Sequence, residues 1–504
     1  MDAYEELRAL FAKLYNFQHL LALGFWDGRT KMPPKGAVAR GEAMAQLQQH
    51  VHELLVAPRT RVLLDTAKAR LSELSPTDRA NLREMEMRHA REAALPDDFV
   101  QRKARTVTAS RAAWPACKAR NDFAAFLPYL ERNVAIAREE ARHRAAATGE
   151  GLYESLFHMY EPGMSMETLN RAFDDVKTWL PELYKNVLES AKSSGAAATV
   201  PLQTPLPLAA QRALVEHFMR LWGFDFDAGR LDLSPHAFTG MAKEDSRITF
   251  NYELHDYAKA LFATIHETGH SKYETNCGPM EMRGQPVCEG RSMTIHESQS
   301  RFAEVIIGCS AAFAEYMVPA LREHLGDQPA FTVENVRRMN QAVTRDHIRV
   351  KADEVSYPLH ILLRYEIERD LIEGRMEAAE VPRAWNEKMK AYFGLETEGR
   401  DNIGCLQDIH WSQAAFGYFP TYALGSMFAA QLMDTIKKEL GEDTVDKCIR
   451  SGEMEPIFAK QKEKIWDQGC LYETEELMIK ATGETLHTRY FREHLERRYL
   501  RHED

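Results

Sequence analysis

Residues 266–270 read His-Glu-Thr-Gly-His, an H-E-x-x-H pattern whose side chains can act together only on a helix. Residues four apart share one face of an α-helix, so His266 and His270 can grip a single Zn²⁺ from the same side. Glu267 then faces the open coordination position, where it can remove a proton from an acidified, zinc-bound water. The pattern therefore predicts a metal-binding helix with the chemistry of peptide-bond hydrolysis.

The residues around this pattern favour the same interpretation. Gly269 lies between the two histidines, where we expect its missing side chain to leave room for the metal and the substrate. The alternative is a helix that carries two histidines and an incidental glutamate. Apolar residues precede the motif at the i, i+3, i+4, i+7 spacing of an amphipathic helix, namely Leu254, Tyr257, Ala258, Leu261, Phe262 and Ile265.

A catalytic zinc site takes a third protein ligand and leaves a fourth position open. A loop rich in glycine and proline, residues 278–290, ends the first helical pattern, and a second one begins at Met293. Glu297 lies near the start of the second pattern, and we predict it as the third ligand. His296 is the alternative, but on a helix it points about 100° away from Glu297, so both cannot easily bind one ion. Glu297 could also be a first-turn acid that the helix dipole favours.

Several further segments of the chain match sequence motifs that occur together in one family of enzymes. The set comprises His296-Glu297-Ser298, Asp245-Ser246-Arg247-Ile248-Thr249 as D-x-R-x-T, residues 404–411 as G-x-x-Q-D-x-H-W, residues 348–360, and residues 26–34. On these motifs the chain resembles the M32 family of metallocarboxypeptidases over nearly its whole length. One departure is visible: residues 236–238 read His-Ala-Phe where the family has H-P-F, and Pro235 precedes the histidine. We therefore carry no role onto His236.

The resemblance implies a cytoplasmic, mostly helical, homodimeric enzyme that removes C-terminal residues from peptides. It also implies one zinc ion per subunit, with cobalt or manganese as possible substitutes. Residue by residue, His266, His270 and Glu297 correspond to the family's metal ligands, and Glu267 corresponds to its general base.

A carboxypeptidase must also recognise a free carboxylate, which the planar guanidinium of arginine pairs bidentately. Arg349 is our first candidate, because it lies in a polar patch just before an apolar run. Arg247 is the second, because it begins a β-like stretch, residues 247–252, directly before the metal helix. A strand there could bind an extended substrate along its edge. The alternative for Arg247 is a structural salt bridge with Asp245.

Stabilisation of the oxyanion needs hydrogen-bond donors near the reacting carbonyl. We assign His410, Tyr418 and Tyr422 to this role by analogy with related helical zinc peptidases, which place a histidine and tyrosines at comparable spacing. A buried aromatic cluster with satisfied hydroxyl groups is the alternative. Asp408 could orient a histidine or a ligand, or it could cap a helix.

Helical periodicity dominates the chain, and β-like runs are few and short. We predict a mainly α fold: a large helical zinc-peptidase fold with a deep cleft and one small β-sheet near the metal helix. A composition break at residues 193–207 is interpreted as a surface loop within a single catalytic unit, residues 1–504. The N-terminal helical part, about residues 1–195, would cover the cleft, and about residues 196–504 carry the motifs. Residues 7–17 form an amphipathic helix that we expect to pack on the body or on a partner subunit.

Composition and charge exclude several classes of protein. No apolar run reaches the roughly 18 residues that span a bilayer. The acidic N-terminus lacks the basic residues followed by an apolar stretch that are typical of a signal peptide. Seven scattered cysteines favour free thiols in a reducing compartment, which points to the cytoplasm. The net charge is −11, and no basic patch with interleaved aromatic residues stands out, so we expect no nucleic-acid or membrane partner.

Three functions remain, and the leading one is a metal-dependent carboxypeptidase that releases C-terminal amino acids from peptides. An endo-acting zinc oligopeptidase would use the same metal machinery. A non-catalytic, zinc-bearing helical scaffold is the third. Glu267 argues against the scaffold, because a purely structural zinc closes its fourth position and needs no base.

Overall fold

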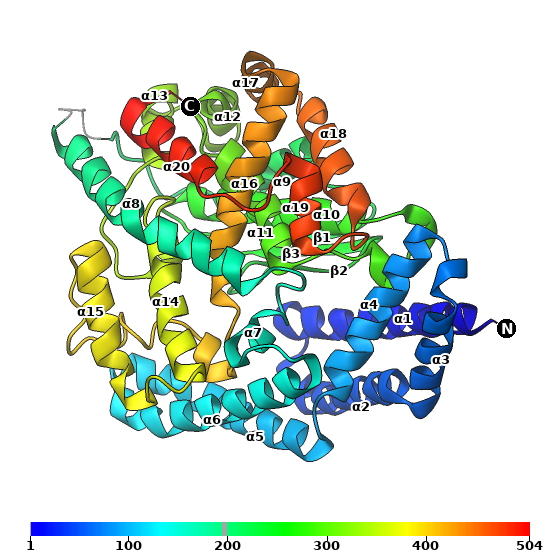
Figure 1. Cartoon of the computed structure of the whole chain (residues 1–504). Coiled ribbons are helices and arrows are strands. Elements are labelled where there is room, and N and C mark those ends of the chain that lie inside the picture. Colours follow the sequence, from blue (N-terminus) through cyan, green and yellow to red (C-terminus); the bar gives the residue numbers. More distant parts are fainter. Residues whose placement is uncertain (1, 194–198, 504) are drawn as a thin grey trace.

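The computed structural model describes residues 2–193 and 199–503, which form a helical protein with a single three-stranded sheet in that part of the chain (Figure 1). The prediction of a mainly α fold with one small sheet is therefore confirmed. The predicted division near residues 195–196 lies outside the described residues.

The first four helices pack around a small apolar core of their own, at the right of Figure 1. Leu7, Phe11 and Leu14 form the buried face of α1 and contact Leu63 and other apolar residues of the neighbouring helices. The amphipathic helix predicted at residues 7–17 thus packs on the body of the protein. The bounds are α1 Ala3–Thr30, α2 Ala37–Val56, α3 Pro58–Ala69 and α4 Pro76–Ala93.

The next helices belong to the main core. One continuous apolar cluster begins at Cys117, at the end of α5, and extends to Tyr499 near the C-terminus. Because α6, α7 and α8 share this cluster with the helices beyond residue 199, the main core crosses the predicted composition break. The bounds are α5 Asp97–Ala119, α6 Phe123–Thr148, α7 Leu152–Phe157 and α8 Met166–Ser193.

The motif-bearing part adds the remaining helices and the sheet. Helix α11 continues into a π-helical segment, Phe302–Ile307, and π segments are frequent at functional sites. The α-helices are α9 Leu208–Leu221, α10 Tyr257–Asn276, α11 Met293–Arg301, α12 Ala311–Leu325, α13 Val333–Asn340, α14 Tyr357–Ile372, α15 Val381–Phe393, α16 Phe419–Leu440, α17 Glu442–Ser451, α18 Glu455–Lys464, α19 Thr474–Thr482 and α20 Arg489–Glu496.

The sheet consists of β1 Gly229–Leu233, β2 Phe238–Ala242 and β3 Asp245–Phe250, in the order β1-β3-β2. Strand β3 pairs in parallel with β1 and antiparallel with β2, and its Ile248 and Phe250 pack in a cluster that includes Ala260 of α10. The stretch at residues 247–252 was expected to offer an edge to substrate, and this expectation is wrong. Both edges of β3 are already paired, and β2, which contacts α10, is the edge strand beside it.

The described part of the chain contains no single helix that is long and apolar enough to cross a membrane. One bent pair, Pro286–Ile307 with Ala311–Leu325, meets the length and composition criteria together.

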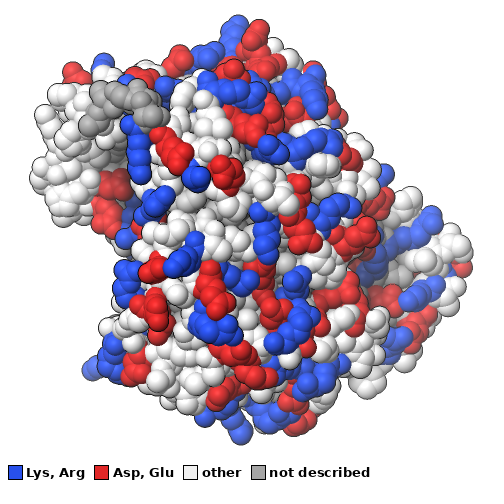
Figure 2. Space-filling model, turned by 60° about the vertical axis from the view of Figure 1, so that its left-hand side comes forward, with Lys and Arg blue, Asp and Glu red and all other residues white. Residues whose placement is uncertain are grey.

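All seven cysteines are free thiols. On the face shown in Figure 2, acidic and basic side chains are interspersed.

Candidate metal centre and active site

Helix α10 presents the H-E-x-x-H residues next to its buried face. The Asp256 side chain caps the helix by accepting a hydrogen bond from the Ala258 N–H at 2.8 Å. Leu261 and Ile265 are completely or almost completely buried, whereas His266 and His270 are partly exposed on the adjoining stripe. The helical periodicity of the sequence therefore aims both imidazoles out of the core.

Three side chains converge there on a common point. Nε2 of His266 and Nε2 of His270 lie 3.7 and 3.5 Å from Oε2 of Glu297, which α11 supplies. Ligand atoms about 2.1 Å from one ion in tetrahedral geometry lie about 3.4 Å apart, so this spacing fits a single metal ion. His266, His270 and Glu297 could thus hold a metal ion together.

The other ring nitrogens of the two histidines are tied to the protein. Nδ1 of His266 lies 2.9 Å from Oε2 of Glu304 in the π-helical segment, and Arg301 donates to the same oxygen at 2.8 Å. Nδ1 of His270 lies 3.1 Å from the His296 carbonyl oxygen. Such contacts fix the ring orientation and leave Nε2 free for a metal, as in other histidine metal sites.

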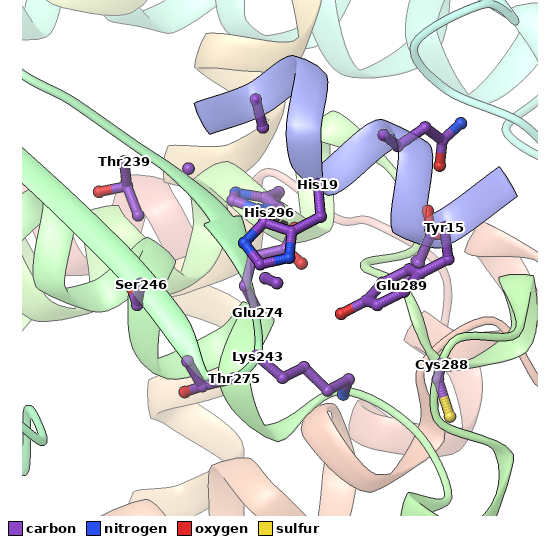
Figure 3. Close-up of a pocket in the computed structure, with 14 residues that line it drawn as sticks. Tyr15, His19, Thr239, Lys243, Ser246, Glu274, Thr275, Cys288, Glu289 and His296 are labelled. Atoms are coloured by element: carbon purple, nitrogen blue, oxygen red, sulfur yellow. Dashed lines mark hydrogen bonds and ion pairs between the residues drawn. The ribbon is translucent and has the colours of Figure 1, made fainter. Parts of the chain in front are cut away.

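His296, the alternative third ligand, lies beside the converging set. Its Nδ1 is 2.6 Å from Nδ1 of His270, and its Nε2 is 2.6 Å from Oε1 of Glu274. His296 and Glu274 line a cavity of about 290 Å³, which α1 closes on the opposite side with Tyr15 and His19 (Figure 3). The His296 ring therefore lies between this cavity and the Nδ1 side of the His270 ring.

The electrostatics of the cluster favour a cation. Burial alone would raise the pKa of Glu297, but the neighbouring imidazoles of His266 and His270 outweigh it and hold that pKa at about 2. Burial disfavours the charged form of His266, yet the carboxylates of Glu297 and Glu304 raise its pKa to about 9. The carboxylates thus stay ionised and attract positive charge to the point where the ligand atoms meet.

Two glycines allow the helices to approach this closely. A Cβ atom at Gly425 of α16 would lie 2.6 Å from Cγ and 2.7 Å from Cβ of Glu297, so only glycine leaves room for the ligand. A Cβ atom at Gly269 would lie 2.7 Å from the Gln299 carbonyl oxygen and 2.8 Å from Cα of Ser300. The prediction that Gly269 makes room for metal and substrate is therefore wrong. It makes room for the backbone of α11.

Glu267 is held by a residue of the edge strand. The Thr239 hydroxyl lies 2.7 Å from Oε2 of Glu267 and 2.9 Å from its carbonyl oxygen, and its one proton can be donated to either. Only 9 % of Glu267 is exposed. Because Thr239 lies on β2, in register with Ile248 of β3, the sheet determines where the Glu267 carboxylate sits.

His410, Tyr418 and Tyr422 lie together at the start of α16. Nε2 of His410 is 3.4 Å from the Tyr422 hydroxyl, and the rings of Tyr418 and Tyr422 are 5.1 Å apart. Burial raises the pKa of Tyr418 to about 12 and that of Tyr422 well above its ordinary value. Burial also lowers the pKa of His410 to about 4. At neutral pH the site therefore offers two protonated phenols and a neutral imidazole.

Arg349 belongs to a buried charge network next to these phenols. Its Nε and Nη2 donate to Oδ1 of Asp408 at 2.9 and 2.8 Å, and its Nη1 lies 3.2 Å from the Tyr357 hydroxyl. Arg364 pairs with the other oxygen of Asp408 at 2.6 Å. Asp408 thus orients two arginines, instead of a histidine or a helix end. Two guanidinium groups share one carboxylate, which leaves a net positive charge.

Arg247 makes the salt bridge that its alternative interpretation describes. Its Nε and Nη2 donate to the two carboxylate oxygens of Asp245 at 2.7 and 3.0 Å, and His19 approaches the same carboxylate at 3.2 Å. The guanidinium also stacks over the Trp26 ring, 4.3 Å from its centroid.

Over residues 6–499 the chain matches the model of the family described as carboxypeptidase Taq (M32) metallopeptidase. The chain belongs to the M32 family. It is 33% identical to thermostable carboxypeptidase 1 of Pyrococcus furiosus over 506 residues, which covers 99% of both chains. It is 32% identical to carboxypeptidase 1 of Bacillus subtilis, over 99% of this chain and 98% of that one.

Solved structures agree with this assignment. Trypanosoma cruzi metallocarboxypeptidase 1 is 51% identical and superposes with a TM-score of 0.97, over 99% of each chain. The Pyrococcus furiosus carboxypeptidase structure described as Apo-Mg is 32% identical, with a TM-score of 0.93 over 99% of each chain. As an M32 enzyme, the protein is a metallocarboxypeptidase, which implies a divalent metal ion and peptide substrates.

Sequence reasoning missed several residues of this M32 site. Glu304 follows Glu297 by seven residues, which is about two helical turns, so the spacing could have indicated it. Gly425 could have been flagged as a glycine inside an apolar helical pattern, where it costs about 1 kcal/mol relative to alanine. Tyr357 lies within the motif at residues 348–360 but was given no role, and Thr239 carries no local signal in the sequence.

Substitution of Thr239 by valine is expected to lower kcat about tenfold or more and to leave KM and metal content nearly unchanged. Valine keeps the shape of threonine but cannot donate to the Glu267 carboxylate. The measurement is steady-state hydrolysis of a short peptide, with the metal content determined on the same samples. Thr239→Ser retains the hydroxyl and should recover most of kcat. A valine variant as active as wild type, or a serine variant as slow as the valine one, would show that the hydrogen bond from Thr239 to Glu267 does not support catalysis.

Proposed function

We propose that this protein removes amino acids one at a time from the C-terminus of peptides, with one Zn²⁺ per subunit held by His266, His270 and Glu297. The convergence of these three ligand atoms, with both Nδ1 atoms engaged elsewhere, carries the proposal. Two imidazoles and one carboxylate form a donor set of catalytic zinc sites, and cobalt or manganese could substitute. When bound, the ion supplies Lewis acidity, which acidifies water and polarises a peptide carbonyl.

Glu267 acts as the general base in this proposal. Its carboxylate takes a proton from the attacking water and returns one to the leaving amine, which departs as the released amino acid. The hydrogen bond from Thr239 keeps the Glu267 carboxylate in one orientation, so the side chain does not have to reorient before the proton is transferred. Thr239 is therefore a positioning residue.

Tyr422, Tyr418 and His410 stabilise the oxyanion that forms at the reacting carbonyl. Tyr422 is the first choice, because it lies on α16 one turn before Gly425, which contacts Glu297. The raised pKa values of the two phenols keep them protonated, as a donor to an oxyanion requires.

Arg349 binds the C-terminal carboxylate of the substrate. The network of Arg349, Arg364 and Asp408 carries one more positive than negative charge, and an incoming carboxylate would balance it. The Arg349 guanidinium lies 5.1 Å from the centre of the Tyr422 ring. Arg349 could therefore hold the C-terminal carboxylate while Tyr422 donates to the carbonyl oxygen of the peptide bond that is cleaved. Arg247 remains the second candidate.

A short peptide with a free C-terminus and its amidated twin test this proposal. We expect the metal-loaded protein to shorten the free acid stepwise and to leave the amide intact, as followed by mass spectrometry. Arg349→Gln should lower kcat/KM for the free acid by about tenfold or more, because a charge-assisted bidentate contact is lost. Arg247→Gln is the matched control, since its arginine already pairs bidentately with Asp245.

The other outcomes distinguish the rival functions. Internal cleavage of both twins would indicate an endo-acting oligopeptidase. No cleavage by protein that holds its metal would support the helical scaffold. A loss confined to Arg247→Gln would transfer the carboxylate-binding role to that residue.

We also propose that residues 1–504 act as a single catalytic unit and form a homodimer in the cytoplasm, without nucleic-acid or membrane partners. The continuous core from Cys117 to Tyr499 supports the single unit. Seven free cysteines are consistent with a reducing compartment. The mixture of acidic and basic side chains in Figure 2 is unlike a basic nucleic-acid footprint.

A further inference from the structure

A second cavity, of about 480 Å³, lies between α4, α6 and the segment that follows α7. None of the residues assigned above to the metal, the base, the oxyanion or the substrate carboxylate lines it. Its walls are largely apolar, with Met87 and Ala90 from α4, Ala94 directly after that helix, Ala147 from α6, and Met159 and Pro162 after α7. Both the volume and the apolar walls are typical of small-molecule sites.

Three arginines also line this cavity, and two of them are paired with acids. Arg144 donates through Nε and Nη2 to Oε1 of Glu140 at 3.0 and 2.8 Å. Arg83 pairs with Glu84 at 2.9 Å and with Glu473 at 3.1 Å. Each of these two guanidinium groups therefore already has a carboxylate in direct contact.

Arg91 differs from these two. Its Nη2 donates to the His158 carbonyl oxygen at 2.6 Å, and no carboxylate of the described residues lies within ion-pair distance of its guanidinium. Burial lowers the pKa of Arg91 to about 10; the more distant carboxylate of Glu84 opposes this shift, and the positive charges of Arg291 and Arg144 add to it. A partly buried guanidinium without a direct ion-pair partner is costly, and an anion bound beside it would lower that cost.

We propose that this cavity binds a small aliphatic carboxylate, with its carboxylate on Arg91 and its chain against the methionine and alanine walls. Arginine pairs bidentately with carboxylates, and the apolar walls exclude a purely inorganic anion as the best ligand. The same chemistry occurs in free hydrophobic amino acids, but their ammonium group would need an unpaired acid. The two acids that line the cavity are already engaged, Glu150 with His158 at 2.7 Å and Glu473 with Arg83 and Arg291. The geometry therefore favours an acid without an ammonium group.

Methyl resonances of the cavity methionines give a local test that the metal centre does not disturb. Metal-loaded protein labelled with methyl-¹³C methionine is titrated with octanoate, leucine or inorganic phosphate. We expect octanoate to shift the Met87 and Met159 resonances in a saturable way, and leucine and phosphate to bind at least about tenfold more weakly. Resonances of methionines remote from the cavity serve as an internal reference.

Two variants probe the contacts and one is a control. Arg91→Gln should weaken octanoate at least about tenfold, and the fold should tolerate it because no ion pair is lost. Ala147→Phe, at an exposed position of the wall, should block entry and keep Arg91 in place. Arg79→Gln is the control, because Arg79 is an exposed arginine of α4, the helix that carries Arg91, and does not itself line the cavity. This variant should bind octanoate like wild type.

Loss of binding in Arg91→Gln and Ala147→Phe, with binding kept in Arg79→Gln, would support the proposal. Equal octanoate affinity in wild type and Arg91→Gln would overturn it. Tighter binding of leucine or phosphate than of octanoate would also overturn it, as would unchanged Met87 and Met159 resonances at saturating octanoate. None of these outcomes depends on which group acts as the base or which arginine holds the substrate, so this test and that of the proposed function can fail separately.

Discussion

Glu267→Gln is expected to lower kcat by about a thousandfold, within the roughly 10²–10⁴-fold range of general-base catalysis, and to leave the metal content intact. Glutamine has nearly the same shape as glutamate, and its amide oxygen can still accept the contact from Thr239. It cannot accept a proton at neutral pH, so only the proton transfer is lost. The measurement combines steady-state hydrolysis of a free-acid peptide with metal analysis of the same samples, and we expect KM to change little.

Glu274→Gln is the matched control for this substitution. Glu274 lies on the same helix, its side chain is 46% exposed, and it contacts His296 at the cavity on the far side of His270. We expect its replacement to lower kcat by less than about tenfold, because it stands outside the proton path. If Glu267→Gln hydrolysed peptides as fast as wild type with its metal in place, another group would have to be the base. If its metal were lost, the substitution would have tested the metal site instead.

The local part of this site could be predicted from the sequence. Two histidines four residues apart must share a helix face, and the apolar spacing correctly placed Tyr257, Leu261 and Ile265 on the buried face, although Leu254 precedes α10 and is exposed. Glu297 required more than spacing, because the preference over His296 rested on helix geometry and on the resemblance to a family. The small sheet before the metal helix was expected from the short β-like run at residues 247–252.

The parts that depend on packing between distant segments could not be predicted. Thr239 reaches Glu267 only because β2 pairs at the edge of β3, and strand order is not encoded in the strands themselves. Arg349 was selected from the polar patch around it in the sequence, yet its ion-pair partner is Asp408, which lies 59 residues away. Gly269 was correctly noticed, but the reason given for it was wrong, because no local pattern indicates how closely α11 approaches.

Gly425→Ala is expected to weaken metal binding by about tenfold to a hundredfold, although residue 425 is not a ligand. The added methyl group would lie 2.6 Å from Cγ of Glu297, far inside normal contact distance, so either the Glu297 side chain or α16 must move. Movement of Glu297 spoils the convergence of the three ligand atoms, whereas alanine itself favours the helix by about 1 kcal/mol. The variant should therefore stay folded and lose its metal.

Metal affinity measured by competition with a chromophoric chelator, together with thermal unfolding, separates these two effects. Excess metal should restore part of the lost activity, which a defect in the base would not allow. Gly41→Ala is the matched control, because a Cβ atom at this position of α2 meets nothing within 4 Å, and it should leave metal affinity unchanged. A Gly425→Ala protein with wild-type metal affinity would show that α16 can retreat without moving Glu297. Helix packing around the third ligand would then be less rigid than the distances between α11 and α16 imply.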